Sequence, residues 1–129
     1  MEKISVGRNS YGTLYGTVRS YTPEGIDDGP QSLLGYGLFF IVRESFDDRS
    51  KVIFRKWTGG GITVTNEAGG LFVVTWQSKD TNIQPLQYAY ECFISPGASG
   101  GTYVEGTTQM KSIGSGIFEI LKGVKYGTA

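Results

Sequence analysis

The clearest alternation of apolar and polar residues lies between residues 70 and 94 and predicts two β-strands. Residues 71–76 are apolar on both faces of an extended chain, as in a strand that is covered on both sides. Residues 86–94 place apolar side chains at every second position, which is typical of a strand with one buried face. A polar connection at 78–82 and Pro85, which cannot donate a hydrogen bond to a sheet, separate the two strands.

Glycine and aspartate clusters divide the rest of the chain into further short segments. Residues 35–46 and 51–58 are rich in aromatic and β-branched residues and flank a charged turn, so they predict a hairpin. No window has the spacing of an amphipathic helix. Further strands are expected at 62–65, 107–113 and 116–121, a strand or extended arm at 10–21, and loops at 22–32 and 95–106.

These seven or eight strands predict an all-β fold, namely an antiparallel two-sheet β-sandwich of the immunoglobulin-like or jelly-roll-like kind. At 129 residues the chain is expected to be one domain. Within it we expect an N-terminal strand or arm and loop at 1–34, the sandwich at 35–124 and a C-terminal tail at 125–129. The strands with the clearest alternation supply the expected core: Phe72, Val74, Trp76, Tyr88, Tyr90, Phe118 and Ile120.

The charge balance changes which partners are expected. Twelve basic residues are matched by twelve acidic ones, so no net field attracts nucleic acid or an anionic membrane. The longest apolar run, residues 38–42, is far shorter than the roughly 20 residues that span a bilayer. The N-terminus also lacks the apolar core of a secretory signal. We therefore expect a protein made in the cytoplasm, with no nucleic-acid or membrane partner.

The sequence contains no histidine and a single cysteine, Cys92. Catalysis by Ser-His-Asp or Cys-His groups, zinc-histidine sites and haem-histidine ligation are thereby excluded. Adjacent Asp27 and Asp28 lack the alternating oxygen ligands of a calcium loop. The glycine clusters at 35–37 and 97–101 lack the lysine or the following helix of a phosphate or dinucleotide site. We therefore expect no cofactor and no metal.

Several short motifs follow one another along the chain in an order that resembles a known family. A strand that ends in apolar and aromatic residues is followed by Asp80-Thr81-x-Ile83-x-Pro85, then by Tyr88-x-Tyr90-Glu91, a glycine-rich loop and Gly116-Ile117-Phe118-Glu119-Ile120. Over residues 60–124 this order resembles the N-terminal β-sandwich domain of bacteriophage baseplate upper proteins and related tail and fibre proteins. The chain departs from that family at Leu86, where the family often has glycine.

The resemblance implies a non-enzymatic virion structural protein, made in the host cytoplasm and found in a baseplate, tail, fibre or head-associated position. Such a protein assembles with itself, often as a trimer, and with other virion proteins, and it has no catalytic residues to carry over. Tyrosine combines apolar area with a hydrogen-bonding tip, so Tyr11, Tyr15 and Tyr21 are the candidate subunit interface. The alternative is that these three side chains fold back on their own sheet.

Two other classes of function stay open. A carbohydrate-binding β-sandwich module would stack sugar rings on exposed aromatic side chains, for which Trp57 and Tyr103 are the candidates, whereas Trp76 is expected in the core. An enzyme would need two carboxylates facing one cleft, and Glu91 and Glu119 lie on strands that could meet. Glutamates at such positions more often simply line a solvated sheet face, so we expect no enzyme.

Overall fold

The described residues form strands and one helical turn, which confirms the all-β part of the predicted fold. The computed structural model describes residues 2–47, 49–96 and 111–122. The helical turn is α1 (Ser78–Thr81). The strands are β1 (Glu2–Gly7), β2 (Gly12–Thr17), β3 (Arg19–Tyr21), β4 (Asp27–Pro30), β5 (Tyr36–Arg43), β6 (Val52–Thr58), β7 (Gly61–Asn66), β8 (Leu71–Trp76), β9 (Gln87–Pro96) and β10 (Lys111–Leu121).

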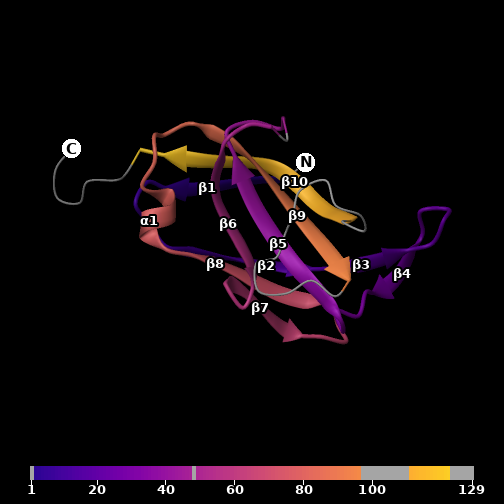
Figure 1. Cartoon of the computed structure of the whole chain (residues 1–129). Coiled ribbons are helices and arrows are strands. Elements are labelled where there is room, and N and C mark those ends of the chain that lie inside the picture. Colours follow the sequence, from indigo (N-terminus) through magenta and orange to yellow (C-terminus); the bar gives the residue numbers. More distant parts are fainter. Residues whose placement is uncertain (1, 48, 97–110, 123–129) are drawn as a thin grey trace.

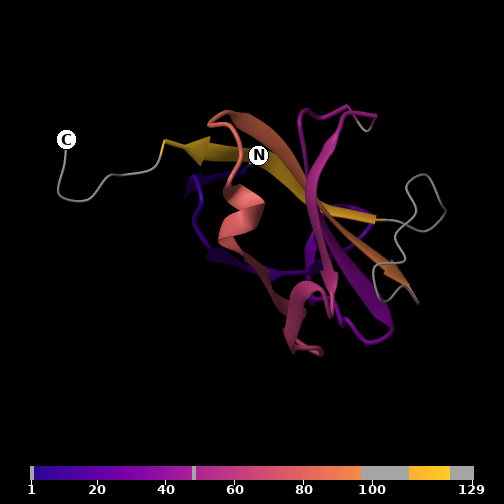
Figure 2. The same cartoon turned by 60° about the vertical axis from the view of Figure 1, so that its left-hand side comes forward.

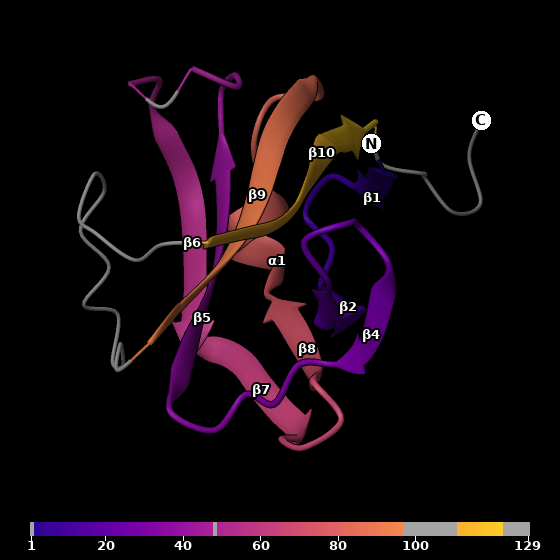
Figure 3. The same cartoon turned by 90° about the vertical axis from the view of Figure 1, so that its right-hand side faces the viewer.

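Eight of these strands form one mixed sheet in the order β1-β10-β9-β5-β6-β7-β8-β2. The sheet curves until it is nearly closed into a barrel, with β1 and β2 on either side of the remaining gap (Figures 1 and 3). The prediction of two packed antiparallel sheets therefore needs correction. Because β5 pairs with both β9 and β6, hydrogen bonding continues around the ring, and the β1–β10 and β6–β7 pairs are parallel.

The core fills the inside of this ring. Phe118 lies at its centre, with its ring 5.5 Å from Trp76 and 5.6 Å from Phe54 in edge-to-face contacts. The expected core is confirmed, because all seven predicted side chains are buried: Phe72, Val74, Trp76, Tyr88, Tyr90, Phe118 and Ile120.

The strand that is buried on both faces is β5, and the prediction of such a strand at residues 71–76 was wrong. In β5, residues 37–42 are all buried. In β8 the outward side chains of Leu71 and Thr75 are exposed. The reason is position, since β5 lies in the middle of the sheet and β8 is next to the edge strand β2.

Part of the predicted 22–32 loop is ordered as a strand. Strands β3 and β4 form a separate two-stranded sheet that extends from the ring (Figure 1). Its Arg19 donates two hydrogen bonds to Asp27, at 2.9 and 3.1 Å. The charge of Arg19 lowers the pKa of the Asp27 carboxyl, first through these hydrogen bonds. The sequence pattern missed this pairing because four residues with no apolar alternation carry no strand signal.

Candidate interaction surface

The main sheet ends in two unpaired edges. Among the described residues, β1 pairs with β10 and β2 pairs with β8, and neither has a second partner. The N–H of Arg8 donates to Leu121 O at 2.9 Å. Since backbone groups point to alternate sides of a strand, Lys3 and Ser5 turn their N–H and C=O groups away from β10. These groups face the gap in the ring.

The same argument applies to β2. The N–H of Val18 donates to Gly70 O at 2.8 Å, and the register with β8 is regular from Gly12 to Thr17. The odd-numbered residues of β2 therefore turn their backbone groups toward the gap. We call the gap the seam, and its seam-facing residues are Lys3, Ser5, Thr13, Tyr15 and Thr17.

One end of the seam is closed by α1. The hydroxyl of fully buried Thr81 accepts a hydrogen bond from Ser10 N–H at 2.8 Å and donates to Ser10 O at 2.6 Å. The N–H of Asn9 donates to Thr81 O at 3.1 Å. These bonds hold the β1–β2 connection against α1 at one end of the ring (Figure 2).

The helical turn is itself fixed to the opposite wall of the ring. Asp80 caps α1 by accepting a hydrogen bond from Gln77 N–H at 2.8 Å. The same carboxylate forms an ion pair with Lys56 of β6 at 2.8 Å, and both side chains are largely buried. This pair connects α1 to a strand that lies far from β1 and β2 in the sheet order.

The other end of the seam opens into a hollow. Strand β1 begins to pair with β10 at Gly116, so the first half of β10 has no partner on its outer edge among the described strands. A hollow of about 170 Å³ separates that edge from the end of β2 and from β3. Its lining residues are Thr17, Arg19, Tyr21, Lys111, Ser112 and Ile113.

A second hollow of about 210 Å³ adjoins the first. Its lining includes Tyr36 and Ile94 together with Lys111, which also lines the first hollow. Lys111 is exposed and has no ion pair with another described residue. Among the described residues, Arg19 and Lys111 give the open end of the seam its charge.

The structure places all three candidate interface tyrosines on the surface. Tyr11 is 83% exposed, Tyr15 is 78% exposed and Tyr21 is 59% exposed. Their side chains do not fold back on the sheet of their own chain. Tyr15 lies on the seam-facing strand β2, and Tyr21 lines the hollow at the open end.

Glycine on the inner face of β2 goes with an outward Tyr15. A Cβ atom at Gly12 would lie 2.8 Å from the Trp76 ring, and one at Gly16 would lie 2.3 Å from the Phe72 ring. These rings of β8 cover the inner face of β2 and leave no room for a side chain there. The Tyr-Gly-Thr sequence at 11–13 and again at 15–17 therefore alternates an inward glycine with outward tyrosine and threonine.

The outer face of β2 and β8 contains no charged residue, in a chain in which 19% of residues are charged. Tyr15 lies opposite Val73, which in turn lies opposite Thr63 of β7. Threonine and leucine complete this face, whose members on the two strands are Thr13, Tyr15, Thr17, Leu71, Val73 and Thr75. An uncharged aromatic and hydroxyl surface suits contact with another protein subunit.

The β1 edge carries charge instead. Glu119 of β10 accepts hydrogen bonds from Ser5 Oγ at 3.2 Å and Gln87 Nε2 at 3.1 Å, and it forms an ion pair with Lys3 at 3.1 Å. These contacts lower the pKa of the Glu119 carboxyl, with the Gln87 hydrogen bond as the largest cause. Glu119 therefore helps to hold β1 beside β10, through side chains on the outer face of the sheet.

Glu91 and Glu119 are not brought together as a catalytic pair. Gln87 lies opposite Glu119, and Glu91 lies four positions further along β9, roughly 13 Å away at about 3.3 Å per residue. Two catalytic carboxyl groups of a glycosidase lie about 5 to 9.5 Å apart. The described residues also contain no group of three or more aspartate, glutamate, histidine or cysteine side chains that could hold a metal ion.

Cys92 is a buried core residue. Burial raises the pKa of its thiol to about 12, so the thiol stays protonated near neutral pH. A thiolate nucleophile would need a lowered pKa.

The candidate sugar-stacking residues are only partly accessible. Trp57 is half-buried, and its indole ring packs against Gly60, where a Cβ atom would lie 2.2 Å from the ring. Trp76 is 3% exposed and belongs to the core. Tyr103 lies outside the described residues. Of the two candidate sugar-stacking residues, the structure describes Trp57, whose indole is partly exposed.

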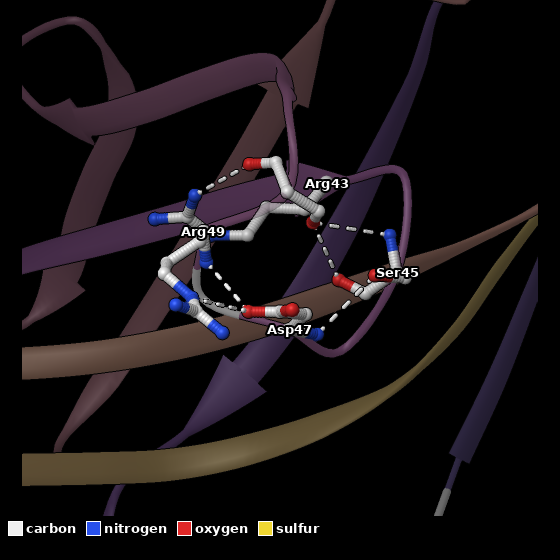
Figure 4. Close-up of polar contacts among 5 residues, drawn as sticks. Arg43, Ser45, Asp47 and Arg49 are labelled. Carbon is white, nitrogen blue, oxygen red and sulfur yellow. Dashed lines mark hydrogen bonds and ion pairs between the residues drawn. The ribbon is translucent and has the colours of Figure 1, made fainter.

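The charged turn between β5 and β6 satisfies its own polar groups (Figure 4). Asp47 accepts a hydrogen bond from Arg49 N–H at 2.9 Å, and Arg43 donates to Ser50 O at 3.1 Å. The hydroxyl of Ser50 donates to Ser45 O at 3.1 Å. These contacts account for the turn as a structural element.

The seam and the Thr81 anchor were not found by sequence reasoning. The segment 78–82 was interpreted as a polar connection, and Thr81 was noted only as a member of the motif Asp80-Thr81-x-Ile83-x-Pro85. Its full burial was not predicted, because a single threonine in a polar run looks solvated. The unpaired edges follow from the order of the strands in the sheet, and the alternation of apolar and polar residues along the chain does not reveal that order. A usable signal was the two inward glycines of the Tyr-Gly-Thr repeat, which mark a strand packed closely on aromatic rings.

The described residues contain no helix long and apolar enough to cross a membrane. No protein-family model matches the chain, and no curated protein matches it significantly.

Proposed function

We propose that this chain is a non-enzymatic virion structural protein of a bacteriophage, which assembles through contacts between subunits and with other virion proteins. The observation that carries the proposal is the unpaired, uncharged edge of β2, with Tyr15 exposed on the strand and Tyr11 exposed just before it. Monomeric proteins usually protect edge strands with charge, proline or bulges. Strand β2 has none of these over Gly12–Thr17.

The virion part of the proposal rests on the motif resemblance. That family's domain is a β-sandwich, whereas the main sheet of this chain is nearly closed into a barrel. The motif positions are nevertheless structural ones here, because Tyr88, Tyr90, Phe118 and Ile120 all lie in the core. The assembly part of the proposal therefore depends on the chemistry of the β2 edge, and only the virion part depends on the resemblance.

The test has two measurements. Light scattering of the purified chain over a range of concentrations should give the mass of a defined oligomer. Mass spectrometry should detect the chain in purified particles of the phage that encodes it. A chain that stays monomeric at high concentration and is absent from particles would contradict the proposal.

Carbohydrate binding is the second candidate function, because Trp57 keeps part of its indole exposed. In that case Trp57→Ala should abolish retention of the folded chain on a glycan panel. Retention of the wild-type chain that this substitution removes would favour the carbohydrate-binding module over the structural protein.

A further inference from the structure

Two hollows meet at Lys111, the first residue of β10. The hollow of about 170 Å³ lies between the start of β10 and the residues from the end of β2 to β3. The hollow of about 210 Å³ lies between the start of β10, the end of β9 and the start of β5. Each is many times larger than the space that one water molecule needs, so each has room for part of an organic ligand.

The charge of the two hollows comes from Arg19 and Lys111, and no carboxylate of a described residue lines either one. The guanidinium of Arg19 donates two hydrogen bonds to Asp27, which compensates its charge. The ammonium of Lys111 is exposed and forms no ion pair with another described residue. The two hollows therefore share one uncompensated positive charge, which suits a ligand that carries one negative charge.

The uncharged part of the lining combines hydroxyl groups with aromatic rings. Thr17, Tyr21 and Ser112 line the first hollow, and their hydroxyls make no hydrogen bond with another described residue. Tyr36 and Gln31 line the second hollow. Each hydroxyl can both donate and accept a hydrogen bond, and each tyrosine adds an apolar ring. A sugar ring has the matching chemistry, because it has an apolar C–H face and a rim of hydroxyl groups.

The strands of the main sheet hold three sides of this lining in place. Lys111 lies opposite Ile94 in the β9–β10 pair, and Tyr36 lies opposite Pro96 in the β5–β9 pair. Thr17 ends the regular β2–β8 pair. Side chains that are positioned by paired strands form a site before the ligand arrives, and such a site loses less entropy on binding.

We propose that the two hollows bind an anionic saccharide unit, whose carboxylate or phosphate pairs with Lys111 while its ring lies against Tyr21. A carboxylate on a sugar acid and a phosphate on a sugar ester present the same kind of group to the ammonium. This inference goes beyond the proposed assembly function and does not depend on it. The site also differs from the candidate platform at Trp57, which belongs to β6 and lines neither hollow.

Two other anionic ligands fit the site less well. A free inorganic anion would contact Lys111 and leave the hydroxyl and aromatic lining to water. An acidic peptide that paired with the outer edge of β10 would need a regular strand edge. The register of β10 with β9 instead shifts between Ser112 and Gly114, and such an irregularity disfavours the addition of a strand.

The decisive experiment is an NMR titration of the isotope-labelled chain with four probes: glucuronate, glucose-6-phosphate, glucose and inorganic phosphate. Glucuronate and glucose-6-phosphate should shift the amide signals of Thr17, Lys111 and Ser112 until the site is saturated. Glucose should bind more weakly because it lacks the charge, and inorganic phosphate should bind more weakly because it lacks the ring. The tighter of the two anionic sugars identifies the charged group that the site prefers.

Substitutions separate the role of the charge from that of the ring. Lys111→Gln should weaken binding of both anionic sugars about fivefold and leave glucose unchanged, because the pair with an exposed ammonium is screened by water. Lys111→Arg should keep most of the affinity. Tyr21→Ala should weaken the anionic sugars and glucose alike, whereas Tyr21→Phe, which keeps the ring, should have a smaller effect.

Lys51→Gln is the matched control for the charge. Lys51 is also exposed and has no ion pair with another described residue. It lies beyond the opposite end of β5, whose eight residues span roughly 23 Å at about 3.3 Å per residue. Its substitution should leave the binding of all four probes unchanged.

Several results would overturn the inference. Inorganic phosphate that binds as tightly as glucose-6-phosphate would show that the hollows recognise charge alone. Equal losses for Lys111→Gln and Lys51→Gln, or no saturable shifts with either anionic sugar, would show that the site is absent. Binding that Trp57→Ala abolishes and Lys111→Gln leaves intact would place the sugar on β6 instead.

Light scattering of the same samples tests the proposed assembly function separately. An oligomeric chain that binds no saccharide would remove this inference and leave the assembly function. A monomeric chain, absent from particles, that binds glucuronate through Lys111 would do the opposite.

Discussion

The two edges of the main sheet are held in place by different chemistry. Strand β1 is fixed from outside, where Lys3 and Ser5 contact the carboxylate of Glu119. Strand β2 is fixed from inside, because Gly12 and Gly16 fit beneath the rings of Trp76 and Phe72. The outer surface of β1 is thus occupied by a polar network, whereas the outer surface of β2 stays uncharged and exposed.

This difference is the structural basis of the assembly that we propose for this chain. Charge at an edge discourages pairing with other chains, and an uncharged regular edge permits it. Since β2 is anchored through its glycines, its tyrosines are not needed for the core and can serve contacts with a partner. We call the packing of Gly12 and Gly16 beneath the rings of Trp76 and Phe72 the inner anchor. Loss of this anchor should have the largest effect, followed by loss of the Thr81 contacts, loss of the Glu119 charge and removal of the Tyr15 side chain.

Removal of the inner anchor should have the largest effect. Trp76→Ala takes away a 3% exposed ring that contacts Phe118 and covers Gly12, and we expect a loss of about 3 to 5 kcal/mol of unfolding free energy. Urea denaturation followed by circular dichroism measures this loss. Trp57→Ala, at a half-buried site, is the control with a smaller expected loss. An unchanged midpoint for Trp76→Ala would contradict the anchor.

Loss of the contacts that close one end of the seam should reduce the free energy of unfolding by less than loss of the inner anchor. Thr81→Val keeps the shape of the side chain but leaves the part-buried N–H and C=O of Ser10 without their partner, at a cost of about 1 to 2 kcal/mol. Hydrogen exchange should become faster in the β1–β2 connection. Thr75→Val, at an exposed site of β8, is the matched control and should change stability by less than about 0.5 kcal/mol. Equal stabilities of the two variants would contradict the role of Thr81.

The inner anchor was largely predictable from the sequence, and the seam was not. Alternation placed Phe72, Val74 and Trp76 together on one face and in the core, although the opposite face of the same strand was wrongly predicted to be covered as well. The same rule placed Phe118 and Ile120 correctly. Burial of one strand face is therefore a local property that the order of residues carries.

Strand order and edges depend on contacts between distant residues. β1 pairs with β10, so Ile4 lies opposite Phe118, and no local pattern indicates such a parallel pair. The two-sheet prediction was wrong for the same reason, because pairing of β5 with both β9 and β6 closes the ring. Tyr11, Tyr15 and Tyr21 could be named from their residue type, but the position of Tyr15 on an edge strand could not.

The charged edge should respond to pH. The folded-state pKa of Glu119 is lowered by Gln87 and Lys3, so its contribution is complete above the unfolded pKa of about 4.3 and is lost as pH falls through the lower folded value. Glu119→Gln should therefore be slightly less stable than wild type at neutral pH and equally stable in acid. The difference should shrink in high salt because the pair is near the surface. A stability difference that persists in acid would show that the substitution acts by another cause.

The smallest effect on stability should come from the surface that we propose for assembly. Tyr15→Ala removes a side chain that is 78% exposed, so the unfolding free energy measured at low protein concentration should change by less than about 0.5 kcal/mol. The same substitution should weaken self-association in light scattering, because it removes an aromatic side chain beside the seam. Tyr11→Ala offers a comparison at an equally exposed site that precedes the strand. If Tyr15→Ala destabilised the isolated subunit as much as Thr81→Val, the tyrosine would belong to the fold, and the contrast between the charged outer face of β1 and the uncharged outer face of β2 would be lost.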